Sequence, residues 1–330
     1  MDGFWSVFPY LLFFLFLFVF PAMARQRHGA AVERKFAAVQ RKRKSRIIAI
    51  VHRQEPMALL GVAQLRYIDL NDAEDVLNAI RMTPKDRPLE LMLHTPGGLI
   101  LPALQIARAV KAHPAPTRVF VPHYAMSGGT LIAMAADEIY LNEHAVLGPI
   151  DPQIGGLPAA SLARVVAAKS PDAVEDYTMV LHDIGQMATQ QLERAARELL
   201  RGTVSDNAAV AVAEQLSSGR WTHDYPIDAH EAAEIGLPAK LGLPDDFAEL
   251  MALFPDRLSG RSVKFTFGLF GGKKAAPHGH SEPPESERVP FTGYQPTPGA
   301  RSFSYGPWNP EDLLPHNRPG PSPRDQRIHR

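Results

Sequence analysis

Two predicted strands each end in a paired-glycine turn that opens a helix. The strand at 89–94 runs into HTPGG at 94–98, and the strand at 118–124 runs into MSGG at 126–129. Glycine adopts backbone conformations that are closed to other residues, and the first N–H groups of a helix have no partner within it. One N–H group from each turn can therefore form an oxyanion hole, a pair of donors that stabilises the charge of a tetrahedral intermediate.

Ser127 lies at the corner between the second strand and its helix. A serine immediately before a helix most often caps it, with the side-chain oxygen accepting from a backbone N–H group. The same position, beside free backbone donors, also suits a nucleophile. Taken alone, the corner leaves both interpretations open.

The chain alternates between strand and helix patterns and then becomes helical, which predicts an α/β fold with a parallel sheet and an α-rich second half. An aspartate before 229–236 predicts one further capped helix. The predicted strands are 46–52, 89–94, 118–124 and 138–142, and the predicted helices are 71–82, 99–112, one opening after Ser127, 159–169, 172–200 and 204–217.

An apolar run at the N-terminus, residues 4–24, contains no charged side chain. A helix of about 20 apolar residues matches the thickness of a bilayer core. A cleaved signal peptide ending at AMA, 22–24, is the alternative, although the positive charge usual at its start is absent. Basic residues follow the run in segment 25–45, which favours an uncleaved single-pass anchor with the rest of the chain on the cytoplasmic face.

The amino-acid composition excludes several classes of function. The 35 basic and 35 acidic residues balance, so overall charge gives no reason to expect nucleic-acid binding. Because the chain has no cysteine, disulfides, thiolate metal sites and a cysteine nucleophile are excluded. The Pro-rich segment 271–330 is typical of disorder. The predicted domains are an anchor at 1–24, a basic juxtamembrane segment at 25–45, a catalytic domain at 46–270 and a tail at 271–330.

Residues 46 to about 240 resemble the Clp protease/crotonase superfamily, most closely the serine dehydrogenase proteinases of the signal peptide peptidase A clan. Three segments carry the resemblance: LMLHTPGGLILPALQIARAV, AMSGGTLIAMAADEIYLNEHAVLGPIDPQ and GRWTHDYPIDAHEAAEIGLP. The resemblance implies a Clp/crotonase-like β/α spiral core, a homo-oligomer, and no metal or organic cofactor. It also implies that Ser127 is the nucleophile and that Gly98 and Gly128 supply the oxyanion donors.

The general base departs from the archetype. At the spacing where the Clp proteolytic subunit has its histidine, this chain has Asp151 and Pro152, which by themselves are typical of a turn. Relatives of signal peptide peptidase A use a lysine further downstream, and Lys169 matches it. A lysine base must be buried to lose its proton, and the apolar sequence around Lys169 favours that. His223 and His144 are the alternative bases.

The sequence therefore predicts a membrane-anchored serine endopeptidase that cleaves peptide or membrane-protein substrates near the bilayer with a Ser127–Lys169 dyad. A crotonase-type acyl-CoA enzyme is a second hypothesis, because it uses the same pair of backbone donors. A catalytically inactive membrane scaffold of the same fold is the third.

Overall fold

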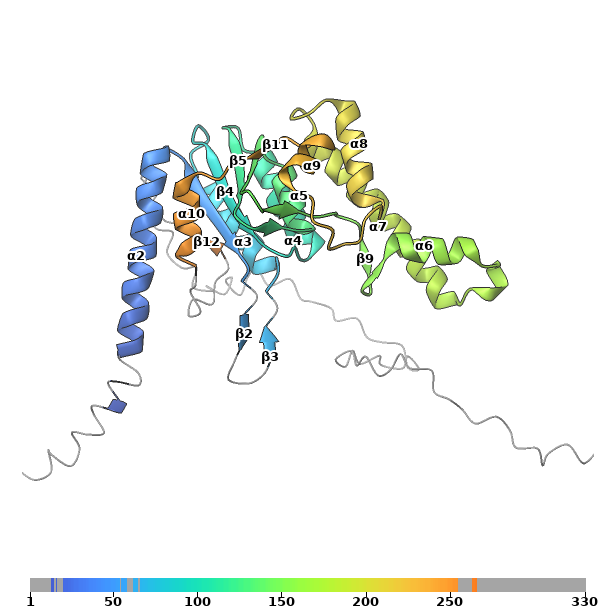
Figure 1. The fold of residues 1–330 in the computed structure, drawn as a ribbon, viewed down its shortest axis with the longest axis horizontal. Helices are drawn as coiled ribbons and strands as arrows, with labels where there is room; N and C mark the ends of the chain where they lie inside the picture. Colours follow the sequence, from blue (N-terminus) through green and yellow to red (C-terminus); the bar gives the residue numbers. More distant parts are fainter. Residues whose placement is uncertain are drawn as a thin grey trace, which may run out of the picture. The chain divides into compact units, whose positions relative to one another are not determined.

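A six-stranded sheet lies at the centre of the computed structural model (Figure 1), in the order β11-β7-β5-β4-β1-β12. The first five strands are parallel, and β12 runs antiparallel to β1. β1 and β4 are buried along their whole length, as expected of a parallel sheet covered on both faces. The strands are β1 Arg46–Val51, β4 Leu89–His94, β5 Thr117–Val121, β7 Glu138–Leu141, β11 Ala239–Leu241 and β12 Val263–Lys264.

The structure describes residues 13–14, 16, 20–53, 55–57, 62–64, 66–254 and 263–265. They belong to one compact unit, Met1–Lys274. Within these ranges, no helix has both the length and the apolar character needed to cross a membrane. Most of the predicted anchor and all of the predicted tail lie outside the described residues.

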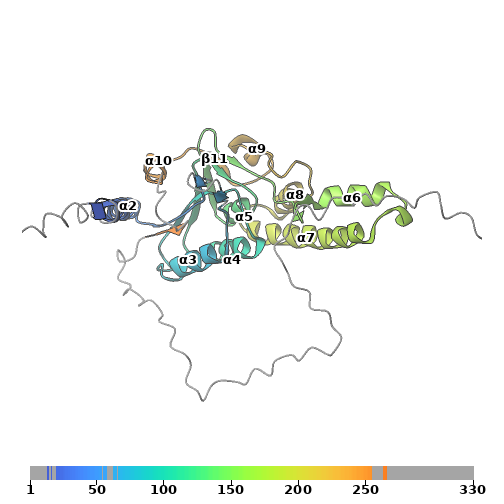
Figure 2. The same ribbon diagram turned by 90° about the horizontal axis from the view of Figure 1, so that it is seen from below.

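Helices cover the two faces of the sheet in separate groups (Figure 2). One face packs against α3 (Leu70–Arg81), α4 (Ile100–Lys111) and α5 (Gly128–Met134). The other face packs against α2 (Phe20–Arg43) and α10 (Asp245–Ala252). Successive side chains of a strand point to opposite faces, so each buried strand contributes apolar residues to both layers.

The second half of the chain is helical, as predicted. It contains α6 (Ala159–Ala168), the 3₁₀ turn η2 (Pro171–Ala173), α7 (Asp176–Leu200), α8 (Asp206–Ser217) and α9 (Ala229–Glu234). α6 packs against α7, and the two extend away from the sheet as an arm (Figures 1 and 2). The predicted cap of α9 is confirmed, because the Asp228 side chain accepts from two backbone N–H groups of its first turn.

Three pairs of short strands lie in the segments that connect the main elements. β6 (Tyr124–Ala125) pairs with β8 (Val146–Leu147), and β9 (Gln153–Ile154) pairs with β10 (Leu157–Pro158). A third pair, β2 (Glu55–Met57) and β3 (Val62–Gln64), follows β1.

Two predicted boundaries differ from the structure by three residues or more. The strand predicted at 118–124 ends at Val121, because Pro122 has no N–H group for the sheet. The helix predicted at 172–200 begins only at Asp176, after η2.

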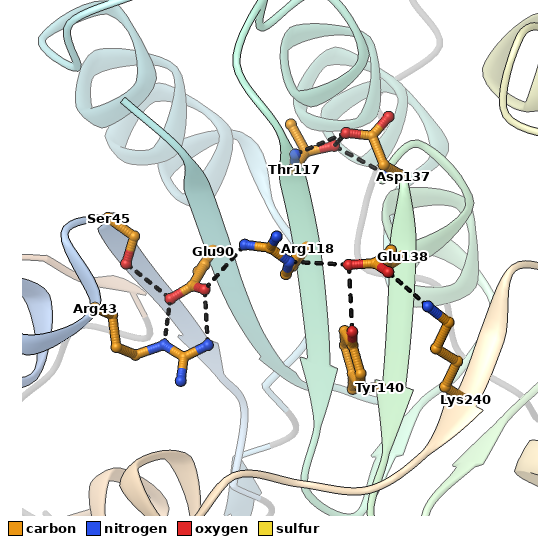
Figure 3. A network of polar contacts seen from close by, with 9 residues as sticks. All are labelled: Arg43, Ser45, Glu90, Thr117, Arg118, Asp137, Glu138, Tyr140 and Lys240. Carbon is orange, nitrogen blue, oxygen red and sulfur yellow. Dashed lines mark hydrogen bonds and ion pairs between the residues drawn. The ribbon is translucent and has the colours of Figure 1, made fainter. Parts of the chain in front are cut away.

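A network of charges fastens the end of α2 to the sheet (Figure 3). Glu90 on β4 is buried and accepts two hydrogen bonds from Arg43, at 2.7 and 2.8 Å. Ser45 donates to the same carboxylate at 2.7 Å. Glu90 raises the pKa of Arg43. Arg118 on β5 lies between Glu90 and Glu138 of β7, so charge alternates across three strands.

Candidate active site

Ser127 has a backbone conformation that is rare for a residue with a side chain. Its φ is 50° and its ψ is −113°. It occupies the N-cap position of α5, but its side chain makes no capping hydrogen bond, so the capping interpretation is wrong. Strained residues held between a strand and a helix often carry a nucleophile. The half-buried hydroxyl of Ser127 is free for such a role.

The two glycine turns pack directly against each other. A Cβ atom on Gly97 would lie 2.8 Å from both Met126 O and Ser127 Cβ. A Cβ atom on Gly98 would lie 2.4 Å from the backbone N and O of Ile68. Both glycines also have positive φ, 103° and 155°. Only glycine fits these positions, and the close packing fixes the first turn relative to the serine corner.

Two backbone donors remain free beside Ser127. Ile68 N donates to Gly97 O at 2.8 Å and Leu99 N donates to Ile68 O at 3.0 Å, a pattern that bypasses the Gly98 N–H group. Within the described residues, neither Gly98 N–H nor Gly128 N–H donates a hydrogen bond. Gly98 N lies 3.5 Å from the point that a Cβ atom on Gly128 would occupy. The two donors are therefore neighbours, as an oxyanion hole requires.

A cavity of about 410 Å³ opens beside Ser127. Gly98, Asp151 and His223 line it together with the serine. Its remaining wall is largely apolar and comes from the first glycine turn, α4, β9 and α7: Pro96, Ile100, Leu104, Ile154 and Leu192. The cavity thus brings the serine corner together with two polar residues that are distant in sequence.

Asp151 and His223 form a hydrogen-bonded pair in this cavity. His223 Nδ1 lies 2.8 Å from Asp151 Oδ1. The Asp151 side chain is only 2 % exposed, and Gln153 Nε2 donates to its other oxygen at 2.7 Å. Because an ionised carboxylate only accepts, Nδ1 carries a proton, and in the neutral ring Nε2 of His223 presents a lone pair. That arrangement is the one a general base needs.

No direct hydrogen bond joins Ser127 Oγ to His223 in this structure, although both residues line the same cavity. Catalytic hydrogen bonds are often long in unliganded enzymes and tighten when substrate binds. Hydrogen bonds also fix the two loops that carry His223 and Asp151. Ile227 exchanges two backbone hydrogen bonds with Leu147, at 2.8 and 2.9 Å, which ties the histidine loop to β8.

The loop that carries Asp151 is also fastened to the serine corner. The buried Thr130 hydroxyl, on α5, lies 2.8 Å from both Ala125 O and Gly148 O. Gly148 N donates back to it at 3.1 Å. The acid and the serine are thereby fixed to the same helix.

The other predicted bases lie elsewhere. Lys169 is the C-cap residue of α6, has an exposed side chain and does not line the cavity. The burial that a lysine base requires is therefore absent in the single chain. His144 is exposed in the turn before β8 and also lies outside the cavity lining.

His94 is buried at the end of β4, where its ring contacts Tyr124 with 4.3 Å between centroids. Burial, and then the neighbouring His123, Arg53 and His52, lower its pKa to about 3. It does not line the cavity. Among the residues that the structure describes, no group of three or more His, Asp or Glu side chains is placed to hold a metal ion.

The comparisons with known proteins agree with this architecture. The family comparison gives the class of protein, a ClpP-like serine proteinase. Residues 1–271 match the family model described as ClpP-like SDH-type serine proteinase. The chain belongs to this family, which confirms the resemblance found in the sequence.

Two relatives come from the archaeon Methanocaldococcus jannaschii. "Uncharacterized protein MJ0137" is 44% identical over 263 residues, which cover 80% of this chain and 92% of the relative. "Uncharacterized protein MJ1495" is 42% identical over 252 residues, which cover 76% of this chain and 86% of the relative.

Solved structures with similar folds are more distant. ClpP1 from Listeria monocytogenes has a TM-score of 0.39 and 15% identity over 62% of this chain and 94% of that chain. A mutant of the 1510-N membrane-bound stomatin-specific protease has a TM-score of 0.39 and 17% identity over 57% of this chain and 79% of that chain. Likeness at this level carries no inference about substrate or assembly.

Proposed function

We propose that this protein is a serine endopeptidase in which Ser127 is the nucleophile and His223, oriented by Asp151, is the general base. The observation that carries the proposal is that Ser127, His223 and Asp151 line one cavity, with the His223–Asp151 hydrogen bond at 2.8 Å. It assigns to His223 the role that the sequence predicts for Lys169. The reason is position, since His223 lines the cavity together with Ser127, whereas Lys169 is exposed and lies outside that lining.

The reaction follows from these roles. His223 Nε2 takes the proton of the Ser127 hydroxyl as Oγ bonds to the peptide carbonyl carbon. The N–H groups of Gly98 and Gly128 bind the oxyanion of the tetrahedral intermediate. His223 then gives its proton to the leaving amine as the peptide C–N bond breaks. A water molecule, deprotonated by the same nitrogen, attacks the acyl carbon, and the proton passes to Ser127 Oγ as the ester bond breaks and the acid product leaves.

The full chain, purified, should hydrolyse an unfolded protein and should lose that activity on treatment with a fluorophosphonate, which reacts with activated serines. Hydrolysis of an acyl-CoA without peptide cleavage would instead support the crotonase-type hypothesis. Absence of both hydrolysis and labelling would support the inactive scaffold.

Membrane attachment is proposed as well, with the catalytic domain on the cytoplasmic face. It is supported by the uncharged run 4–24 and by the basic segment after it. Arg43, near the end of that segment and the last residue of α2, is bound to Glu90 of the sheet, which ties the segment to the catalytic domain. The full chain should stay in the membrane pellet after alkaline extraction, and deletion of residues 1–24 should release it. Full-length protein in the soluble fraction would contradict the proposal.

A second copy of the chain is the proposed partner of the arm. Tyr177, Val180, Ile184 and Met187 on α7 are exposed by 65, 55, 40 and 48%. Their spacing of three and four residues places them on one side of the helix. A continuous apolar stripe of this kind is typical of helix-to-helix contacts.

Introducing charge on this stripe should dissociate the oligomer. The double substitution Val180→Glu and Ile184→Glu places two carboxylates where an apolar contact is expected, so light scattering should report the monomer mass. Gln186→Glu, at an exposed position away from the stripe, should leave the oligomer intact. An unchanged mass for the double variant would exclude α7 as the interface.

A further inference from the structure

A second set of threonine, histidine and aspartate side chains lies beneath the first glycine turn. His52 Nδ1 is 2.8 Å from Thr95 Oγ1, and His52 Nε2 is 3.0 Å from Asp72 Oδ2. These are the residue types of a catalytic triad, yet His52 and Thr95 are 0% exposed and Asp72 is 7% exposed. No substrate reaches them, so their role must be exerted through the residues that they hold.

The hydrogen-bond partners assign the protons along this series of side chains. The Asp72 carboxylate only accepts, so in the neutral ring His52 Nε2 carries the proton and Nδ1 accepts. The Thr95 hydroxyl donates to Nδ1 at 2.8 Å, which is closer than its other acceptor, Gly97 O, at 3.3 Å. Thr95 Oγ1 in turn accepts from Gly97 N–H at 3.2 Å. The order of donors is therefore Gly97 to Thr95 to His52 to Asp72. The series begins at Gly97 in the first glycine turn, and the next residue, Gly98, is the proposed oxyanion donor.

Thr95 also joins the first glycine turn to the serine corner. Its N–H group donates to Tyr124 O at 3.0 Å, and its carbonyl accepts from Met126 N at 3.0 Å. A Cβ atom on Gly129 would lie 2.7 Å from Thr95 Cγ2. One residue thus contacts both turns, through its backbone, its methyl group and its hydroxyl.

Asp72, the last acceptor in this series of hydrogen bonds, is also connected to the same turn. Asp72 Oδ2 also accepts from Asp69 N at 3.0 Å, within the capping box that begins α3. Ile68, the residue before Asp69, is hydrogen-bonded to Gly97 O and to Leu99 N. The first glycine turn is therefore hydrogen-bonded to both Thr95 and Ile68. Thr95 is connected to Asp72 through His52, and Ile68 through its neighbour Asp69.

We propose that Thr95 is a positioning residue for the Gly98 oxyanion donor and that the buried His52–Asp72 pair holds its hydroxyl in place. The inference rests on the proposed function, because it concerns the same oxyanion hole. Without the hydroxyl, Gly97 N–H and His52 Nδ1 would be buried without partners, which is costly. The turn would shift to satisfy them, and the Gly98 donor would no longer point at the oxyanion.

Thr95→Val tests the proposal, because valine keeps the branched shape of threonine and replaces only the hydroxyl group, with a methyl group. Loss of an oxyanion donor costs about 100- to 1,000-fold in kcat, so its displacement should lower kcat per titrated active site about 10- to 100-fold. KM should change little, because the donors act mainly in the transition state. Binding of a peptide boronate, which forms a tetrahedral adduct on the serine, should weaken by a similar factor.

Two variants provide matched controls. Thr95→Ser restores the hydroxyl and should recover most of kcat. Thr83→Val removes another buried threonine hydroxyl, which donates to Ala79 O at 2.8 Å at the end of α3. It should lower stability and leave kcat per active site unchanged.

Several outcomes would overturn the inference. One is a normal kcat per titrated site in Thr95→Val, even with a reduced number of active sites, since that result indicates a merely structural role. If Thr95→Val does not fold, His52→Gln replaces it, because glutamine cannot bridge Thr95 and Asp72 together. A normal kcat in that variant would overturn the inference as well. Continued hydrolysis by Ser127→Ala would refute the proposed function instead.

Discussion

Replacing Ser127 by glycine should abolish hydrolysis and at the same time stabilise the fold. The hydroxyl is lost, so the rate should fall about 1,000-fold or more. The backbone strain at φ 50° is relieved as well, because glycine adopts positive φ without steric cost. Strain at such a residue is of the order of 1–3 kcal/mol, so the free energy of unfolding should rise by about 1 kcal/mol. Peptide hydrolysis and urea unfolding measure the two effects.

Ser127→Ala is the matched control for this variant. Alanine also lacks the hydroxyl but keeps the side-chain carbon that makes positive φ costly. It should therefore lose hydrolysis and fluorophosphonate labelling without the gain in stability. Labelling that persists in Ser127→Ala would remove the serine from its role. Equal stability of the two variants would show that the corner is not strained.

Asp151→Asn should have the second-largest effect. Asparagine presents its amide in place of the carboxylate, so His223 loses the charge that stabilises its protonated form. If the amide N–H group turns toward Nδ1, the ring also takes the wrong tautomer. In a serine protease with a Ser-His-Asp triad, this change lowers kcat about 10,000-fold. The rate of peptide hydrolysis should fall by about 100-fold at least, with little change in folding.

Asp224→Asn provides the comparison. Asp224 is the immediate sequence neighbour of His223 but is exposed and does not line the cavity. Its amide variant should hydrolyse peptides at the normal rate. A loss of activity in Asp224→Asn together with a normal rate in Asp151→Asn would show that Asp224, and not Asp151, is the acid.

Local sequence was sufficient to predict the serine corner and the glycine turns. Strand, turn and helix follow one another directly in the chain, and glycine is required where backbone approaches backbone. The same is true of α9, because its cap and the helix it starts are neighbours. The broken strand at Pro122 was predictable in principle from the missing N–H group.

The acid and base could not be predicted in the same way. Asp151 and His223 are 72 residues apart and meet only because β8 binds Ile227. One signal was present, since Asp151 stands at the spacing where the Clp archetype has its histidine. The apolar sequence around Lys169 suggested burial, but α6 lies on the arm, where even Val165 is 42% exposed. Hydrophobicity alone does not show which helix face another element covers.

Two alanine variants of the full chain distinguish His223 from Lys169 as the residue that activates Ser127. The measurement is the rate of peptide hydrolysis per folded subunit. His223→Ala should lower it by about 100-fold or more, the contribution of a general base, while Lys169→Ala should remain close to the unmodified protein. A near-normal rate for His223→Ala with a 100-fold loss for Lys169→Ala would contradict the account and restore the Ser127–Lys169 dyad.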